Sequence, residues 1–212
     1  MDKVVIFGMG GHGRVVADAL KLEGRYELVG FVDRQSSTSS QGKVLSEPEL
    51  VASGIKKGVV AIGDNFVRAE ISKKILQMIP DFEFVRVFHP RSSVSPSAVI
   101  GPGTVVLDGA VVGPFSKVGS HVILNTRSSV DHDGVLGDFA SLAPGVTCGG
   151  GVVLGEYCAI GLGANLIHNV KLQDHVVVGA GATVLEDLPG SVVAYGNPCK
   201  VIRSRAPGEK YL

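Results

Sequence analysis

Apolar residues follow two different patterns along the chain, and the change falls near residue 88. From residue 88 to residue 184 every sixth position is apolar, seventeen times in succession and without an insertion. Glycine often follows such an anchor directly, and a small or β-branched residue usually lies four places after it. Hairpins would give loops of irregular length, so this constant period argues against an ordinary all-β domain. The anchors are Phe88, Val94, Ile100, Val106, Val112, Val118, Leu124, Val130, Leu136, Leu142, Cys148, Leu154, Ile160, Leu166, Leu172, Val178 and Val184.

A repeat of six residues is typical of a short strand followed by a turn. Three such units close a triangular coil of eighteen residues, and successive coils stack in parallel at about 4.8 Å. The anchors are then expected to fill the interior, the small residues to fit the crowded corners, and the glycines to ease the turns. The sequence therefore predicts a left-handed parallel β-helix, with a C-terminal tail, over residues 88–212.

Residues 1–87 instead alternate between strand and helix patterns, which predicts a small parallel sheet of the Rossmann type. Charged residues also change in density, with 23 in the first 87 positions and 17 in the remaining 125. We therefore divide the chain into an α/β Rossmann-like half-domain, 1–87, and a β-helix domain, 88–212. The expected strands are 3–7, 26–33, 58–62 and 82–88; the expected helices are 13–22, a short one after Ser46, and 65–78 with Asp64 or Asn65 as its cap; residues 35–41 are expected to form a polar loop.

A glycine-rich loop follows the first strand. Gly8, Gly10 and Gly13 satisfy the pattern G-x-G-x-x-G at the start of a helix, and Asp33 ends the second strand twenty residues after Gly13. Such glycines let the backbone approach a pyrophosphate at the helix N-terminus, while the acid can hold a ribose hydroxyl. His12 within the loop can bond a phosphate. The alternative is a tight strand-to-helix turn that binds nothing.

The size of this half-domain argues against a nicotinamide cofactor. A dinucleotide is bound across two mononucleotide halves, and only about one half fits before the repeat begins. A ligand with one nucleoside and a pyrophosphate, such as a nucleotide-sugar, suits the half-domain better. Gly63, Asp64 and Asn65 follow the third strand and are expected to flank the same crevice.

One turn of the repeat carries residues suited to catalysis. Asp131-His132-Asp133 follows an anchor, and a histidine beside carboxylates is typical of a general base. Gly150 lies one coil after His132 and His168 lies two coils after it, so the three fall in one column. Bare amides near Gly150 can stabilise an oxyanion, and a base beside such donors is what acyl transfer requires. An ordinary solvated turn is the alternative.

Composition excludes several other classes. Lys plus Arg and Asp plus Glu both number 20, and this zero net charge disfavours binding to nucleic acid or to an anionic membrane. The opening apolar run, residues 4–7, is too short for a signal peptide, and no stretch approaches the roughly 18 residues of a membrane span. The three cysteines form no close pair, so a cytoplasmic location is expected. The histidines of the repeat are not spaced as a zinc site, so no metal is expected.

Further motifs lie in order along the chain: residues 8–13, 31–33, 61–65 with Arg68, 89–90, 123–126, 131–133 and 196–203. Together they resemble the sialic acid O-acetyltransferase (NeuD-type) family of sugar acyltransferases. Within that family the resemblance is closest to the UDP-4-amino-sugar N-acetyltransferases of the bacillosamine type. The hexapeptide repeat alone is shared by many acyltransferases, whereas its pairing with this N-terminal domain is more specific.

The resemblance implies a homotrimer that binds acetyl-CoA between neighbouring β-helices and a nucleotide-sugar in the N-terminal domain. It makes His132 the general base and Asp133 its acidic partner. It also implies that the Gly150 amide donates to the thioester carbonyl and that Asn125 contacts the sugar near the reacting amine. The residues expected around the nucleotide are Gly8, Gly10, His12, Asp33, Gly63, Asp64 and Asn65.

Two positions depart from the family pattern. Bacillosamine-type relatives have Glu directly after the base, where this chain has Asp133, and they often have a second histidine where this chain has Ser141. Because a hydroxyl can also hydrogen-bond a thioester, Ser141 stays among the expected coenzyme contacts. His168 either lines the groove or is only exposed. It is included with Ser141 among the expected coenzyme contacts. So are Lys200 and Arg203 of the C-terminal segment, which suit the coenzyme phosphates.

These observations predict an acetyltransferase that moves acetyl from acetyl-CoA to the C4 amine of a UDP-4-amino-4,6-dideoxy sugar, with no metal and no nicotinamide. O-acetylation of a sialic acid or a related sugar is the alternative within enzymes. A non-catalytic nucleotide-sugar-binding scaffold and a dehydrogenase are the alternatives from other classes. The choice among UDP, TDP, CDP and CMP stays open at this point.

Overall fold

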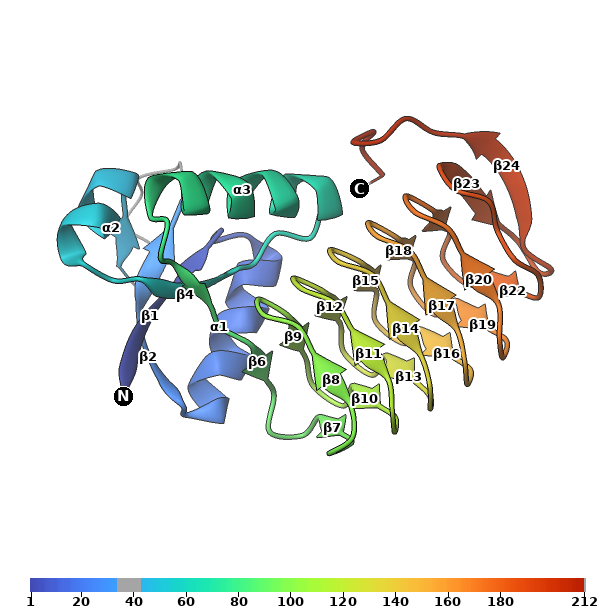
Figure 1. Ribbon diagram of the computed structural model, residues 1–212, viewed down its shortest axis with the longest axis horizontal. Coiled ribbons are helices and arrows are strands. Elements are labelled where there is room, and N and C mark those ends of the chain that lie inside the picture. The colour runs from blue at the N-terminus through green and yellow to red at the C-terminus, as the bar shows by residue number, and fades with distance from the viewer. Residues whose placement is uncertain (34–42, 212) are drawn as a thin grey trace.

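The computed structural model describes residues 1–33 and 43–211, which form an α/β domain followed by a three-sided parallel β-helix (Figure 1). The fold class expected from the sequence is thereby confirmed. The polar loop expected over 35–41 lies outside the described residues. The first domain contains β1 (Asp2–Phe7), α1 (Gly11–Glu23), β2 (Tyr26–Val32), β3 (Val44–Leu45), α2 (Glu47–Ser53), β4 (Lys57–Val60), α3 (Asn65–Met78) and β5 (Glu83–Phe84).

The first domain is one half of a doubly wound fold. Its five strands are parallel and lie in the order β3-β2-β1-β4-β5. Helix α1 packs on one side of this sheet through Val16 and Leu20. Helices α2 and α3 cover the other side through Leu50 and Ile75. The carboxyl ends of β1, β2 and β4 therefore meet at one edge, where such sheets bind their ligands.

The predicted strand over 82–88 is wrong as a single element. Its first part is β5, which pairs with β4 in the first sheet, and its last part is β6 (Val87–Phe88), which pairs with β9 of the β-helix. The propensity to form a strand is continuous through this segment, and only the strand with which it pairs changes. β6 begins one residue before the division expected at 87/88, and that division stays a prediction.

The β-helix is built from strands of two residues that pair with the strand eighteen residues away, as in Val112 with Val130. Its strands form three faces. The first face holds β6, β9 (Val105–Val106), β12 (Ile123–Leu124), β15 (Ser141–Leu142), β18 (Ala159–Ile160), β21 (Val177–Val178), β23 (Val192–Tyr195) and β24 (Lys200–Ser204). The second holds β7 (Ser93–Val94), β10 (Val111–Val112), β13 (Ser129–Val130), β16 (Thr147–Cys148), β19 (Asn165–Leu166) and β22 (Thr183–Val184). The third holds β8 (Val99–Ile100), β11 (Lys117–Val118), β14 (Val135–Leu136), β17 (Val153–Leu154) and β20 (Lys171–Leu172).

Three corners join these faces in every coil. The first corner leads from the first face to the second, as at residues 125–128. The second corner leads from the second face to the third, as at 131–134, and the third corner returns to the first face, as at 119–122. The anchors and the small residues four places after them form one continuous buried core inside the prism, as the period predicted.

Glycines directly after the anchors serve close stacking rather than turn geometry. None of them adopts a left-handed backbone, which is instead found two residues further on, at Phe115, His121 and their equivalents. A Cβ added to Gly101 would lie 2.5 Å from the backbone of Gly119 in the next coil, and one on Gly137 would lie 2.6 Å from the backbone of Glu156. These glycines therefore let neighbouring coils approach each other.

The α1 side of the first domain packs on the first face of the β-helix. Outward-facing Val105 and Ile123 share a hydrophobic cluster with Ile6 and Val16. At the other end of this face β24 pairs antiparallel with β23. The chain then turns back and ends beside α3 (Figure 1). The first face is thus bordered by the first domain at one end and by the tail at the other.

Candidate functional site

His132 and Asp133 form a hydrogen-bonded pair at the second corner. His132 Nδ1 lies 2.8 Å from Asp133 Oδ2, and the His132 backbone N–H donates to Asp131 Oδ1 at 2.7 Å. Both side chains of the pair are exposed. The hydrogen bond to Asp133, with the nearby charge of Asp131, raises the pKa of His132 above its ordinary value. The pair is therefore oriented through Nδ1, which leaves Nε2 to exchange a proton.

Gly150 lies directly beside the His132 imidazole. A Cβ added to Gly150 would stand 2.5 Å from His132 Nε2, so only glycine leaves room for this ring. The two turns are tied together by the Gly151 N–H, which donates to the His132 carbonyl at 2.9 Å. Among the described residues no acceptor takes the Gly150 N–H. His132 and Gly150 are thus neighbours, as the eighteen-residue coil predicted, while the oxyanion role of the Gly150 amide stays a prediction.

His168 stands one coil further along the same column and is exposed. A Cβ added to Gly149 would lie 2.8 Å from its Nδ1 atom, and Asn169 donates its N–H to the Gly150 carbonyl at 2.9 Å. His168 therefore borders the glycine turn on the side away from His132. Its expected part in coenzyme binding stays a prediction.

A separate cavity of about 450 Å³ lies between the first domain and the first face; we call it the interdomain pocket. One end is polar and brings together four residues that the sequence singled out: His12, Gly63, Asn125 and Ser141. The sequence analysis missed a further polar residue of the lining, Tyr211. The rest of the pocket is apolar and runs along β12, β15, β18 and β21; it is lined by Ile123, Leu142, Ala143, Pro144, Ala159, Ile160, Gly161, Leu162, Val177, Val178, Gly179 and Ala180.

His12 brings an unused polar atom to this pocket. Its Nε2 atom is buried and has no hydrogen-bond partner among the described residues. Burial, reinforced by the charge of Arg68, lowers the pKa of His12 to about 4, so the imidazole is neutral at physiological pH. A neutral imidazole with a buried, unpartnered nitrogen is suited to a hydrogen bond with a ligand.

The glycine-rich loop packs as its motif requires. Gly8 has φ +100°, and a Cβ on Gly13 would lie 2.1 Å from the Gly8 carbonyl oxygen. Gly10 is the N-cap of α1 and supplies no side-chain cap, and the first turn of α1 holds no acidic residue. Asp33 Oδ2 accepts the Met9 N–H at 2.8 Å, so this acid also fixes the loop. Gly8 and Asp33 line a second cavity of about 230 Å³.

The start of α3 revises the expectation for Asp64 and Asn65. Asp64 caps the helix, because its Oδ1 atom accepts the Val67 N–H at 2.9 Å. Asn65 is buried, and its Nδ2 atom donates to the carbonyls of Tyr157 and Cys158 in the β-helix. Both side chains are therefore engaged in structure. Of the three residues predicted here, only Gly63 lines the interdomain pocket.

Arg68 completes this junction. Its guanidinium is fully buried and donates to the carbonyls of Ile62, Gly63, His121 and Phe139 and to Asn65 Oδ1. All the N–H donors of the guanidinium are used, which compensates for burying its positive charge. Arg68 thus fixes the Gly63 loop onto two successive coils. The periodic pattern of the sequence did not predict this contact, because most of the acceptors that Arg68 meets are backbone carbonyls.

Lys200 and Arg203 lie on β24, at the end of the first face remote from the first domain. Both are exposed. Arg203 forms an ion pair with Glu209 at 2.7 Å, which raises the pKa of the guanidinium. The structure therefore puts these cations on the face that bears the interdomain pocket.

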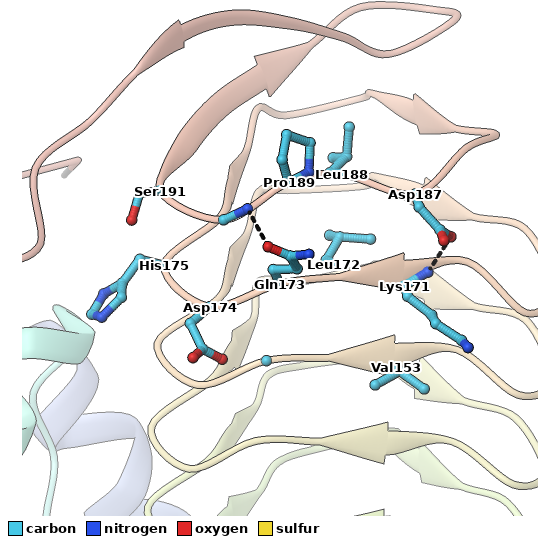
Figure 2. A pocket seen from close by; sticks show the side chains of 12 residues that line it. Val153, Lys171, Leu172, Gln173, Asp174, His175, Asp187, Leu188, Pro189 and Ser191 are labelled. Carbon is cyan, nitrogen blue, oxygen red and sulfur yellow. Dashed lines mark hydrogen bonds between the residues drawn. The ribbon is translucent and has the colours of Figure 1, made fainter.

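The large open pocket in Figure 2 is separate from the interdomain pocket. It lies on the third face, between β20 and the segment 187–191. Its polar groups bond each other, since Gly190 N–H donates to Gln173 Oε1 and Lys171 N–H donates to Asp187 Oδ1. It contains none of the residues that the sequence predicted for catalysis or binding.

Two kinds of feature are absent from residues 1–33 and 43–211. In that part of the chain no helix is long and apolar enough to cross a membrane. In the same ranges no three His, Cys, Asp or Glu side chains are grouped so that they could hold a metal ion.

A half-domain with a phosphate-type glycine loop, joined to a hexapeptide β-helix with a His–Asp pair, defines the sugar acyltransferase class. A family model described as the PglD N-terminal domain matches residues 3–75. The chain is 32% identical over 162 residues to GDP-perosamine N-acetyltransferase of Escherichia coli O157:H7, a match that covers 72% of each protein. It is 31% identical over 114 residues to UDP-N-acetylbacillosamine N-acetyltransferase of Bacillus subtilis; that match covers 50% of this chain and only 52% of the relative.

Solved structures agree with these relatives. PerB from Caulobacter crescentus, in complex with CoA and GDP-perosamine, superposes with a TM-score of 0.90 at 36% identity and covers 96% of this chain and 98% of its own. The acetyltransferase domain of PglB from Neisseria gonorrhoeae, in complex with acetyl coenzyme A, gives 0.88 at 34% identity and covers 94% and 98%. The chain belongs to this family of nucleotide-amino-sugar N-acetyltransferases.

Proposed function

We propose that this protein transfers the acetyl group of acetyl-CoA to the C4 amine of a nucleotide-linked 4-amino-4,6-dideoxy sugar. The observation that carries the proposal is the second corner, where His132 Nε2 lies beside Gly150, whose amide has no acceptor among the described residues. A base and an oxyanion donor on one position are the two groups that acyl transfer to an amine requires.

His132 is the general base of this mechanism. The sugar amine attacks the thioester carbonyl carbon, and its proton passes to Nε2 as the C–N bond forms. Asp133 holds the ring by Nδ1 and stabilises the imidazolium that results. The C–S bond then breaks, and the imidazolium returns the proton to the departing thiolate.

The Gly150 amide stabilises the tetrahedral intermediate. Negative charge develops on the carbonyl oxygen during attack, and a fixed N–H donor near that oxygen lowers the barrier. Because the Gly150 N–H has no acceptor among the described residues, it needs no rearrangement before it can donate.

The apolar part of the interdomain pocket suits the extended arm of the coenzyme. It spans the coils of Asn125, Ser141, Ala159 and Val177, a rise of about 14 Å along the axis. The thioester then reaches the polar end at Asn125. Lys200, on the same face at its far end, suits the coenzyme phosphates, and Arg203 would join it by leaving Glu209.

The diphosphate of the nucleotide-sugar is expected at α1 rather than at α3. Both helices begin at the ligand-binding edge of the sheet, and both N-termini attract anions. However, Asp64 and Tyr211 already occupy the first N–H groups of α3, whereas α1 has no side-chain cap. Gly8, Gly10 and His12 therefore surround the phosphates in this proposal, and Asp33, directly after β2, is expected near the ribose.

The separation of these parts supports a homotrimer. The interdomain pocket belongs to the first face, while His132 lies at the second corner and is not among its lining residues. A second copy whose second corner lies against the pocket would bring them together. Three β-helices around a three-fold axis would do this three times with identical contacts.

The nucleotide is UDP or GDP in this proposal. The family expectation was a UDP-linked sugar, while PerB, with 36% identity over 96% of this chain, is complexed with GDP-perosamine. Both ligands share the diphosphate and an amino sugar, for which the glycine loop and His132 are suited. O-acetylation of a sialic acid remains the competing reaction, although the relatives that match are named as N-acetyltransferases.

Thiol release from acetyl-CoA, measured against UDP-, GDP- and TDP-linked 4-amino sugars and against free and CMP-linked sialic acid, tests the proposal. We expect release only with amino sugars, and a product whose acetyl group resists hydroxylamine because it is an amide. Release with sialic acid and a hydroxylamine-sensitive product would favour O-acetylation. Binding of a nucleotide-sugar without any release would favour a non-catalytic scaffold.

A further inference from the structure

The C-terminal tail folds back onto the catalytic region and brings a tyrosine into the interdomain pocket. After β24, Arg205 donates to the Glu209 carbonyl and to the His175 carbonyl, and Glu209 pairs with Arg203. These contacts turn the chain toward α3, where it ends in Figure 1. Tyr211 then lines the pocket together with residues of both domains.

The phenol of Tyr211 is held in a fixed position. Its oxygen accepts the Asn65 N–H at 3.0 Å, and the Arg205 guanidinium lies 5.5 Å from the centre of its ring. Burial raises the pKa of this phenol above its ordinary value, so the hydroxyl stays protonated at physiological pH. Tyr211 therefore offers the pocket a neutral hydroxyl whose oxygen cannot move freely.

Ser141 supplies a second hydroxyl beside the first. Ser141 and Tyr211 both line the interdomain pocket, and the Ser141 hydroxyl is near enough to the Tyr211 phenol to offset a small part of the rise in its pKa. Each hydroxyl carries one proton and can accept two hydrogen bonds. If Tyr211 donates to Ser141, the serine proton is free; if Ser141 donates to Tyr211, the phenol proton is free. In either case one O–H remains to donate to a ligand.

The neighbours of this hydroxyl pair indicate which ligand it meets. His12 and Gly63 come from the domain assigned to the nucleotide-sugar, and Asn125 is the expected contact to the sugar. Except for Ile123, the apolar lining assigned to the coenzyme comes from residues that follow Ser141. The pair thus shares the pocket with the residues expected to contact the nucleotide-sugar, whose hydroxyl and phosphate oxygens are acceptors.

We propose that Tyr211 and Ser141 form one hydrogen-bonding unit that binds an oxygen of the nucleotide-sugar. The inference rests on the proposed function and deepens it by adding a residue of the C-terminal tail to the acceptor site. It also assigns Ser141 to the sugar rather than to the coenzyme.

The first test is Tyr211→Phe, which keeps the ring and removes the hydroxyl. We expect KM for the nucleotide-sugar to rise about 3- to 10-fold, the usual effect of one lost hydrogen bond, with KM for acetyl-CoA within about twofold. Tyr26→Phe is the matched control, because Tyr26 is also partly buried but begins β2. An unchanged KM for the nucleotide-sugar, or a rise in KM for acetyl-CoA instead, would overturn the inference.

The second test measures whether the two hydroxyls act as one unit. Ser141→Ala and Ser141→Ala/Tyr211→Phe are compared with Tyr211→Phe through KM for the nucleotide-sugar. A shared unit predicts that the double variant is no worse than about the larger single effect, whereas independent contacts would multiply. Multiplying effects would contradict the unit. If the unmodified protein releases no thiol with any amino sugar, the proposed function fails instead.

Discussion

The reactivity of the second corner comes from the residues on either side of one imidazole. Asp133 accepts a hydrogen bond from His132 Nδ1 and, with Asp131, favours the protonated ring. A general base must be neutral to act, so the same interaction that orients the ring also moves its working range to higher pH. Activity is therefore expected to rise with pH through the raised pKa of His132.

Replacing Asp133 with Asn should separate these two effects. Without the carboxylate the pKa of His132 falls toward its ordinary value, so the acid limb of kcat/KM shifts to lower pH. The plateau should also fall, because the imidazolium formed during transfer is stabilised less. The measurement is the pH profile of thiol release for both proteins. An acid limb that stays in place would mean that another group controls it.

These residues differ in how far the sequence could reveal them. Asp133 was predictable because it adjoins His132, and Gly150 because the coil repeats every eighteen residues. Asn65 was not, since its side chain was expected near a nucleotide but instead bonds two carbonyls of the β-helix. Tyr211 was missed for the same reason: its position depends on how the tail folds back, and no local pattern records that.

At the scale of elements, the side chains at the third corner form a stack of rings that the six-residue hydrophobic period did not predict. His121, Phe139, Tyr157 and His175 lie eighteen residues apart and stack nearly parallel, with centroids 4.7 to 5.4 Å apart. Each occupies the left-handed position of its turn. The spacing was visible in the sequence, but the hydrophobic pattern did not mark these positions because the rings lie outside the prism. The stack lies against α3, where His121 contacts Ser72.

The buried end of this stack should make the fold sensitive to acid. Burial, with the nearby Arg68, lowers the pKa of His121 to about 4, below its ordinary 6.5. The unfolded chain binds the proton first, so stability is complete above about pH 6.5 and is lost as the pH falls toward 4. At about 1.4 kcal/mol per pKa unit the loss is on the order of 3 kcal/mol.

His121→Phe should remove this contribution. Phe139 already occupies the equivalent position at φ 59°, and Ser72 keeps its bond to the Arg68 carbonyl, so the new ring fits without stranding a polar group. Denaturant unfolding at pH 7 and at pH 5 measures the difference in free energy. We expect a smaller drop in the variant, in which buried His12 still contributes. An unchanged drop would show that His121 is not the group responsible.

For the whole molecule, the separation between base and pocket is the feature with the largest consequence. The i+18 pairing fixes which residues share a corner, so it predicted that His132 and Gly150 meet. The same geometry keeps His132 away from Asn125, which lies at the first corner. The family resemblance implies a homotrimer, and the separation within one chain is what a site shared between copies would require.

Mixed assemblies test whether the site is shared between copies. His132→Ala and Asn125→Ala are each expected to be nearly inactive alone. If the base of one copy serves the pocket of the next, reassociating them at equal amounts should restore about a quarter of the full activity, because each site draws one chain at random for each role. Activity no greater than the average of the two variants would indicate that each chain holds a complete site.

The most direct test of the central claim, that His132 is the base for acetyl transfer to a nucleotide-linked amine, is kcat for thiol release in His132→Ala. His89→Ala, at the first corner, is the matched control. A lost general base predicts that kcat falls about 10²- to 10⁴-fold while both KM values change little. A kcat within a few-fold of the unmodified protein, measured with an amino sugar that this protein acetylates, would contradict the claim.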